Sequence, residues 1–153
     1  MKNNVLLPVI NGIADVLKAV NAKAQIYIDT PPNVDSATGG YFYVKPVNVT
    51  SENLLSDAVL LHAVFDVMYF PAESQLNNSV VLMDALYSLN IALRHIYPAN
   101  NVNGQYTKGR MKKGQVLDSK IVDGVVHTTV RYDLYLDVEE KIELVRDVFF
   151  INE

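Results

Sequence analysis

The sequence contains no cysteine and no tryptophan among its 153 residues. The absence of cysteine excludes disulfide bonds and thiolate metal sites, and leaves the redox compartment open, with an intracellular protein as the default. No apolar run approaches the roughly 18 residues that a membrane-spanning helix needs. A formal net charge of −4 gives no global indication of nucleic-acid binding.

Catalytic motifs are also missing. There is no Gly-x-Ser-x-Gly elbow, no phosphate-binding Gly-x-x-x-x-Gly-Lys run and no dinucleotide fingerprint. The three histidines, His62, His95 and His127, fall in separate predicted elements, and none has a second histidine or a carboxylate at metal-ligand spacing on a helix. We therefore expect no catalytic residue, no cofactor, no metal site and no enzymatic activity.

His62 and Asp66 form the one pairing of chemical interest, because both lie on one face of a predicted strand. Residues four apart in a strand are about 13 Å apart, so these two cannot hydrogen-bond to each other. Asp66 is expected to meet an arginine, a backbone amide or a subunit boundary. The enzymatic alternative is a small hydrolase that uses Asp66 and His127.

What the chain does contain predicts one α+β domain over residues 1–153. We expect an antiparallel or mixed sheet of four to five strands with two main helices packed on one face. Half of the residues are hydrophobic and a fifth are charged, which is typical of a globular protein.

The clearest local signal is a β-hairpin over Gln115–Leu136, with a two-residue turn at Asp123-Gly124. The turn places Val122 opposite Val125, Ile121 opposite Val126 and Leu117 opposite Val130. The alternation predicts a buried face with Leu117, Ile121, Val126, Thr128, Val130, Tyr132, Leu134 and Leu136. It predicts a polar face with Asp118, Lys120, His127, Thr129, Arg131 and Asp133.

Two helices are predicted from apolar residues at helical spacing. The first covers residues 3–22, and Pro8 can shift its start. We interpret this segment as a helix and not as a signal peptide, because polar residues interrupt its apolar run. The second covers residues 72–96, with Ser74 as a candidate N-cap and Pro98 beyond its end.

Three strands are predicted before the hairpin. They cover residues 24–30, 41–49 and 58–70. Pro46 makes the second an edge strand or a bulged strand at that point, and residues 50–57 are expected to form a turn or a helical half-turn. The third is apolar on both faces, which indicates a central strand covered on two sides.

Residues 99–114 are predicted to be a long basic loop, with Lys108, Arg110, Lys112 and Lys113. Such a loop is either simply solvated or docks onto an acidic partner surface. The C-terminal tail, residues 139–153, could be a short helix followed by a strand, and periodicity does not decide between forms. The many aromatic residues suggest that some lie at a protein interface; they are Tyr41, Phe42, Tyr43, Tyr69, Phe70, Tyr132, Tyr135, Phe149 and Phe150.

Two segments carry a family resemblance: FDVMYFP, ending at Pro71, and IVDGVVH running into VRYD, ending at Asp133. With the order of helices and strands around them, they resemble the small tail-terminator proteins of long-tailed bacteriophages and phage-tail-like particles. The resemblance covers about residues 24–137, and its motifs are structural.

The resemblance implies a structural virion protein, located in the virion tail and assembled in the host bacterial cytoplasm. Such proteins form a homohexameric ring that caps the tail tube, stops its polymerisation and offers a docking face to head or neck proteins. The alternative is another head–tail joining or tail-completion protein of similar fold. The implied partners are further copies of the chain, the tail tube protein, and neck, connector or sheath proteins, without a membrane.

In such a ring, DNA would pass through the lumen without specific binding, which argues against a strongly basic lumen. We therefore expect Lys108, Arg110, Lys112 and Lys113 to face an acidic neighbour. The polar face of the hairpin, with Lys120, His127 and Arg131, is a candidate subunit interface.

Overall fold

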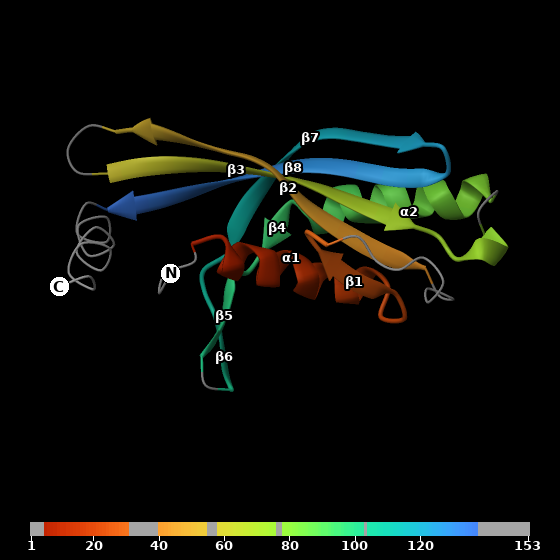
Figure 1. Ribbon diagram of the computed structural model, residues 1–153, viewed down its shortest axis with the longest axis horizontal. Helices are drawn as coiled ribbons and strands as arrows, with labels where there is room; N and C mark the ends of the chain where they lie inside the picture. The colour runs from red at the N-terminus through yellow and green to blue at the C-terminus, as the bar shows by residue number, and fades with distance from the viewer. Residues whose placement is uncertain (1–4, 31–39, 55–57, 76–77, 103, 138–153) are drawn as a thin grey trace.

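A computed structural model of the chain describes residues 5–30, 40–54, 58–75, 78–102 and 104–137. Two α-helices lie on one face of a curled sheet, and a small hairpin projects on the same side (Figure 1). The sheet has six strands in the order β1-β2-β3-β8-β7-β4, and the projecting hairpin is a separate two-stranded sheet. The predicted α+β class is confirmed, but four to five strands was too few.

Helix α1 (Leu7–Val20) has Pro8 in its first turn, where a missing backbone N–H costs nothing. The expected influence of Pro8 on the start is confirmed. Its buried residues Val9, Ile10, Ile13 and Leu17 recur at helical spacing and enter the core.

Helix α2 (Ser79–Ala92) is shorter than predicted at both ends. A 3₁₀ turn, η2 (Glu73–Gln75), precedes it, and Asn78 is the N-cap in place of Ser74. The Asn78 side chain accepts a hydrogen bond from the Val81 amide at 3.3 Å, which satisfies one of the free N–H groups of the first turn. At the other end, β4 (His95–Ile96) replaces the predicted last turn, because Ile96 is buried beside β7.

The sheet is mixed. β1 (Gln25–Ile28) is parallel to β2 (Tyr41–Asn53), while every other neighbouring pair is antiparallel. β3 (Ala58–Phe70) has the predicted bounds and lies centrally, between β2 and β8 (Val125–Asp137). The prediction that β3 is covered on both faces is wrong for the described residues, since both helices lie on one face of the sheet. On the other face Leu60 and Met68 are nevertheless each only 9% exposed.

β2 continues four residues past its predicted end, so the expected turn at residues 50–57 is wrong over its first half. Thr50 to Asn53 pair with His62 to Val59 of β3, because cross-strand hydrogen bonds override the local turn signal. A bulge lies between Pro46 and Asn48, as one of the two predictions for Pro46 required. Beyond Val44 no described strand pairs with the outer side of β2, so the edge prediction also holds there.

The hairpin of β7 (Lys112–Val122) and β8 has the predicted turn. Asp123 and Gly124 have φ values of 51° and 77°, as a type I′ turn requires. The pairs of Val122 with Val125 and of Ile121 with Val126 are confirmed. The pair of Leu117 with Val130 is wrong, because a bulge between Val116 and Asp118 shifts the register.

The bulge changes which residue of β7 faces the core. Val116 lies opposite Val130 and packs against the core, whereas Leu117 is 47% exposed. Ile121 keeps its predicted partner but is also exposed near the hairpin end.

Residues 99–114 are not a long loop. They contain the hairpin of β5 (Ala99–Val102) and β6 (Gln105–Lys108), with Gly104 at a φ of 80°, and the start of β7. Two contacts hold this hairpin to α1: Asn11 Nδ2 donates to the Ala99 carbonyl at 2.9 Å, and the Tyr106 hydroxyl donates to Asp15. The hairpin therefore projects from the helix layer (Figure 1).

One core joins the helices to the sheet. The inward-facing residues of β2, β3 and β8 pack against α1 and α2, and Tyr132 is the largest fully buried side chain. Gly114 permits the closest approach, since a Cβ there would lie 2.4 Å from the Leu93 carbonyl oxygen. No described helix is long and apolar enough to cross a membrane. The tail prediction, residues 139–153, falls outside the described residues.

Candidate interaction surface

The face of the sheet away from α1 and α2, here called the helix-free face, carries most of the polar side chains that β3, β7 and β8 contribute. Strand periodicity places them there, because the alternate residues of each strand enter the core. The acidic, basic and histidine residues that these pairings place on this face are Lys45, Glu52, His62, Asp66, Asp118, Lys120, His127, Arg131 and Asp133.

His62 is the centre of the first cluster on the helix-free face. Its Nδ1 lies 2.7 Å from Asp133 Oδ1 on β8, and its Nε2 lies 3.2 Å from Glu52 Oε2 on β2. The hydrogen bond to Asp133, followed by the one to Glu52, raises the pKa of His62 above its ordinary value. An imidazole between two carboxylates therefore ties three neighbouring strands together.

Asp66 and His127 form the second cluster. His127 Nδ1 is 3.3 Å from Asp66 Oδ2, so within the described residues Asp66 meets a histidine of β8 and not the expected arginine or backbone amide. Its expected position at a subunit boundary stays a prediction. Asp66 and His62 make no contact with each other, as their spacing predicted. The second Asp66 oxygen is buried and has no hydrogen-bond partner among the described residues.

Arg131 and Lys120 each lie beside a carboxylate. Arg131 Nε is 3.2 Å from Asp133 Oδ1, although the angle does not give a hydrogen bond. Lys120 Nζ is 3.4 Å from Asp118 Oδ2. Both cations are thus compensated within the subunit, and such partly exposed pairs contribute little to stability.

The structure brings together only part of the predicted interface set. Lys120, His127 and Arg131 share the helix-free face. Lys108 and Arg110 are exposed between the projecting hairpin and β7, and Lys113 lies opposite His95 of β4. Lys112 Nζ is 6.0 Å from the centre of the Tyr135 ring, at cation–π distance. The four basic residues therefore follow one path from β6 into β7.

The helix-free face offers histidine–carboxylate contacts and surface ion pairs. Among the described residues, no group of three or more histidine, aspartate or glutamate side chains is arranged to hold a metal ion. The hydrolase alternative does gain one observation, since Asp66 and His127 are in contact. However, neither histidine–carboxylate pair lies in the groove described next.

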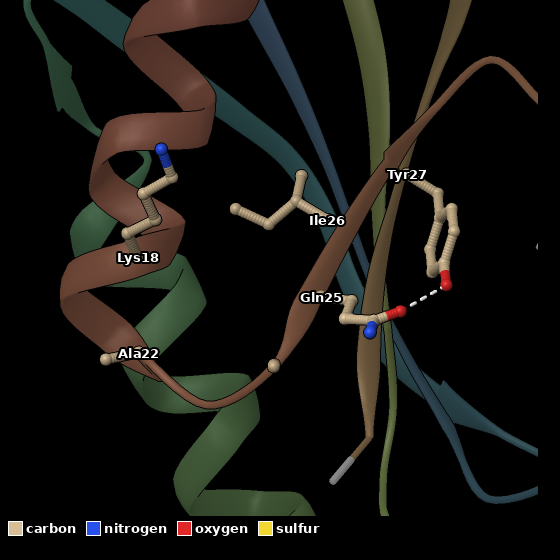
Figure 2. A pocket seen from close by; sticks show the side chains of 6 residues that line it. Lys18, Ala22, Gln25, Ile26 and Tyr27 are labelled. Atoms are coloured by element: carbon tan, nitrogen blue, oxygen red, sulfur yellow. Dashed lines mark hydrogen bonds between the residues drawn. The ribbon is translucent and has the colours of Figure 1, made fainter. Parts of the chain in front are cut away.

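A shallow groove of about 460 Å³ lies between the end of α1 and β1. Figure 2 shows Lys18 and Ala22 of the α1 side, with Ile26 pointing between helix and sheet. Tyr27 and Gln25 point to the other side of β1, where the tyrosine hydroxyl donates to the Gln25 side chain. Lys18 is the sole ionisable group among the lining residues apart from Tyr27, so the groove has no acid–base pair.

That some of the aromatic residues lie at a protein interface stays a prediction, but burial removes four of them from the candidates. Tyr41, Phe42, Tyr69 and Tyr132 are buried inside the subunit, and only Tyr135 is mostly exposed among the aromatics of β8. Phe149 and Phe150 fall outside the described residues. Aromatic content alone could not separate a core position from an interface position.

Sequence patterns did not identify the apolar surface that the structure leaves uncovered. One part is a stripe on α2 formed by Val80, Met83, Tyr87 and Ile91, whose helical spacing could have revealed it. The other part follows the two sides of the sheet. It contains Val47 and Val49 of β2, and Leu117, Ile121 and Val122 of β7.

Comparison with known families identifies the chain. A family model described as phage tail terminator protein matches residues 8–144, which is most of the sequence and nearly all of the described structure. The protein belongs to the phage tail terminator family. No individual curated protein matches it.

Membership makes the protein a structural component of a bacteriophage tail. The tail terminator fold as seen in this chain offers three kinds of surface: a polar helix-free face, a basic path from β6 into β7, and exposed apolar strips on α2 and on the sheet margins. The resemblance drawn from the sequence segments is therefore confirmed.

Proposed function

We propose that this tail terminator assembles as a homohexameric ring that caps the finished tail tube. The ring stops addition of further tube subunits and gives head or neck proteins a surface on which to dock. The observation that carries the proposal is the family match over residues 8–144. The exposed apolar strips support it, because contiguous uncovered apolar surface marks protein–protein contacts.

Its partners in this role are further copies of the chain, the tail tube protein, and neck, connector or sheath proteins. The basic path of Lys108, Arg110, Lys112 and Lys113 docks on an acidic partner surface. A net-acidic protein that concentrates basic residues in one short segment favours oriented docking through that segment.

The helix-free face, for which the sequence suggested a subunit interface, is in this proposal directed toward the channel through which DNA passes, without specific binding. Support comes from its internal ion pairs: Lys120 and Arg131 lie beside Asp118 and Asp133, so this surface has little uncompensated positive charge. A strongly basic wall would bind the phosphate backbone and slow its movement. Assembly takes place in the cytoplasm of the host bacterium, before the tail joins the head.

The proposal is tested with growing tail tubes. Tube protein is polymerised in the presence and absence of the purified protein, and tube lengths are measured by negative-stain electron microscopy. We expect shorter tubes of uniform length, each with a ring on its last tube layer. Tubes of unchanged length without a terminal ring would contradict the proposal.

The position of the protein in the intact particle distinguishes this role from that of another head–tail joining or tail-completion protein. Gold labelling of the protein in intact particles should mark the layer directly on the last tube ring. Label at the head vertex, separated from the tube by other proteins, would favour the joining role.

A further inference from the structure

Two strands of the sheet have long margins that no described strand pairs. β1 pairs with β2 only along Tyr41–Val44, which leaves the outer side of β2 open along residues 46–53, here called the β2 edge. β4 pairs with β7 only at Lys112 and Lys113, which leaves the outer side of β7 open along residues 115–122, the β7 edge. The two edges have the same number of residues.

Both edges are suited to pairing. In an antiparallel ladder every second residue of an edge strand directs its backbone N–H and C=O outward, and these groups form a template for another strand. Both edges also expose apolar side chains, with Val47 and Val49 on the β2 edge and Leu117, Ile121 and Val122 on the β7 edge. The two charged side chains of the β7 edge, Asp118 and Lys120, pair with each other, so they do not exclude a partner strand.

Strand direction identifies a second copy of this chain as the partner. β2, β3, β8 and β7 are each antiparallel to the next, so β2 and β7 run in opposite directions. A second copy in the same orientation therefore places its β7 edge antiparallel to the β2 edge of the first, with all helices on one side. This contact joins two different surfaces, and it can repeat until a ring closes.

The strands next to each edge restrict the register. Full overlap sets Val49 opposite Ser119 and Asn48 opposite Lys120 of the neighbour. A shift of two residues in one direction would bring the hairpin end of the neighbour to Val44, where Ile28 of β1 is already paired. A shift of two in the other direction would set Glu52 opposite Asp118, and directly opposed like charges are destabilising. Between the bulges at Val47 and Leu117 the proposed register keeps matching faces together, and odd shifts would place core-facing residues on the opposite face there.

The same register gives a geometry that can close. Within one subunit, the two edges are offset along the strand direction, because the β2 edge lies near the β2–β3 hairpin and the β7 edge near the β7–β8 turn (Figure 1). At the proposed pair the offset is four residues, because Val49 lies beside Ala63 of β3 whereas Ser119 lies, through Thr128, in line with Val67. Four residues span ~13 Å along the strands, and four strands span ~19 Å across. These lengths correspond to a strand tilt of about 35°, at the lower end of the range of about 35–45° at which sheets close into barrels.

We propose that the β2 edge of each subunit pairs antiparallel with the β7 edge of the next copy, so that the ring contains one continuous sheet. The inference rests on the proposed ring and specifies which surfaces form its subunit contact. Val49 and Ser119 lie opposite each other across that contact, on the same side of the sheet as the helices.

The absence of cysteine allows a direct cross-linking test. Val49→Cys and Ser119→Cys are prepared as separate proteins, mixed in equal amounts under conditions of ring assembly, oxidised, and analysed on non-reducing gels. Directly opposed strand residues have Cα atoms within the separation that a disulfide bond requires. We expect several-fold more disulfide dimer from the mixture than from either variant alone.

A matched control tests the register. Val49→Cys mixed with Ile121→Cys moves one thiol by two residues along the same face, and should give several-fold less dimer. Circular dichroism of each variant establishes that it is folded. The double variant V49C/S119C should form a covalent ladder that ends at the size of the ring.

The outcomes separate this inference from the proposed function. Rings visible by electron microscopy without the mixed dimer would overturn edge pairing and leave the capping role intact. Strong dimer from Val49→Cys alone or from Ser119→Cys alone would also overturn it, because a head-to-tail contact does not join identical positions. A wild-type protein that forms no ring, either at high concentration or on tail tubes, would overturn both.

Discussion

Removal of one hydroxyl group, by Tyr132→Phe, tests how β8 is joined to the end of α2. Tyr132 is fully buried, and its hydroxyl donates to the Leu93 carbonyl oxygen at 2.6 Å. Leu93 is the C-cap residue of α2, where helix carbonyls lose their partners within the helix. Burial raises the pKa of Tyr132, so the hydroxyl remains protonated and able to donate at neutral pH.

The expected loss follows from the carbonyl group that is left behind. Phenylalanine preserves the ring and its contact with Phe65, so no large cavity forms. The Leu93 carbonyl, however, would be buried without its partner, which costs about 1–3 kcal/mol. For a chain of this size, a loss of about 2 kcal/mol lowers Tm by roughly 4–8 °C.

The assay is urea unfolding followed by circular dichroism, at a concentration low enough that the protein is monomeric, because assembly would add to the apparent stability. Tyr87→Phe is the matched control, since Tyr87 is 68% exposed on α2. A change in the free energy of unfolding below about 0.5 kcal/mol would refute the reasoning, as would an equal change in the control. The raised pKa of Tyr132 gives a second test. Above about pH 10 the tyrosine ionises in the unfolded chain but not in the folded protein, so the difference in free energy of unfolding between the wild type and Tyr132→Phe should become smaller there.

Three further predictions concern close packing, protonation and charge. Gly114→Ala should destabilise by about 1–3 kcal/mol, because the new Cβ would lie 2.4 Å from the Leu93 oxygen; Gly109→Ala, with its nearest atom at 3.3 Å, is the control in the same urea assay. His62→Gln should reduce Tm more at pH 6 than at pH 8, because the pKa of His62 is raised in the folded protein. The stability that protonated His62 contributes is therefore fully present below the ordinary histidine pKa, and it is lost as the pH rises through the pKa of the folded state. An equal reduction in Tm at both pH values would contradict this, because it would mean that protonation of His62 does not stabilise the fold. Arg110→Glu together with Lys112→Glu should weaken docking in tube-binding assays at low salt and leave the circular dichroism spectrum unchanged; docking that is unaltered at both low and high salt would reject the acidic-partner prediction.

Local signals were sufficient where one short segment contains the whole physical cause. Asp123-Gly124 allows positive φ at both turn positions, and the predicted turn has that geometry. β3 has its predicted bounds because a continuous apolar run ends at Pro71. Pro8 and Pro46 also acted as predicted, since proline fixes φ and removes a donor regardless of the rest of the fold.

Predictions failed where a distant segment supplied the deciding contact. Residues 99–114 have a loop-like composition, yet they form a hairpin that two hydrogen bonds with α1 help to hold: Asn11 donates one, and Asp15 accepts the other. The last residues of the predicted second helix became β4, because Ile96 is paired with Lys112 of β7 and enters the core. Periodicity measures one element at a time and contains no information about these partners.

The candidate surface was predicted in the same partial way. Alternation along β8 correctly separated His127 and Arg131 from the core, because a strand that buries one face directs the other side chains away. It could not show that His127 contacts Asp66 or that His62 lies between two carboxylates, since those contacts join three strands.

The sequence by itself determined the α+β class, the central strand, the hairpin turn and the family, because each depends on local patterns or on residues in order. Only the tertiary structure decided the number of strands, the bulge at Leu117 and the positions of the two open edges. Which side of a strand remains unpaired depends on where neighbouring strands end. That is a property of the assembled sheet and not of any one segment.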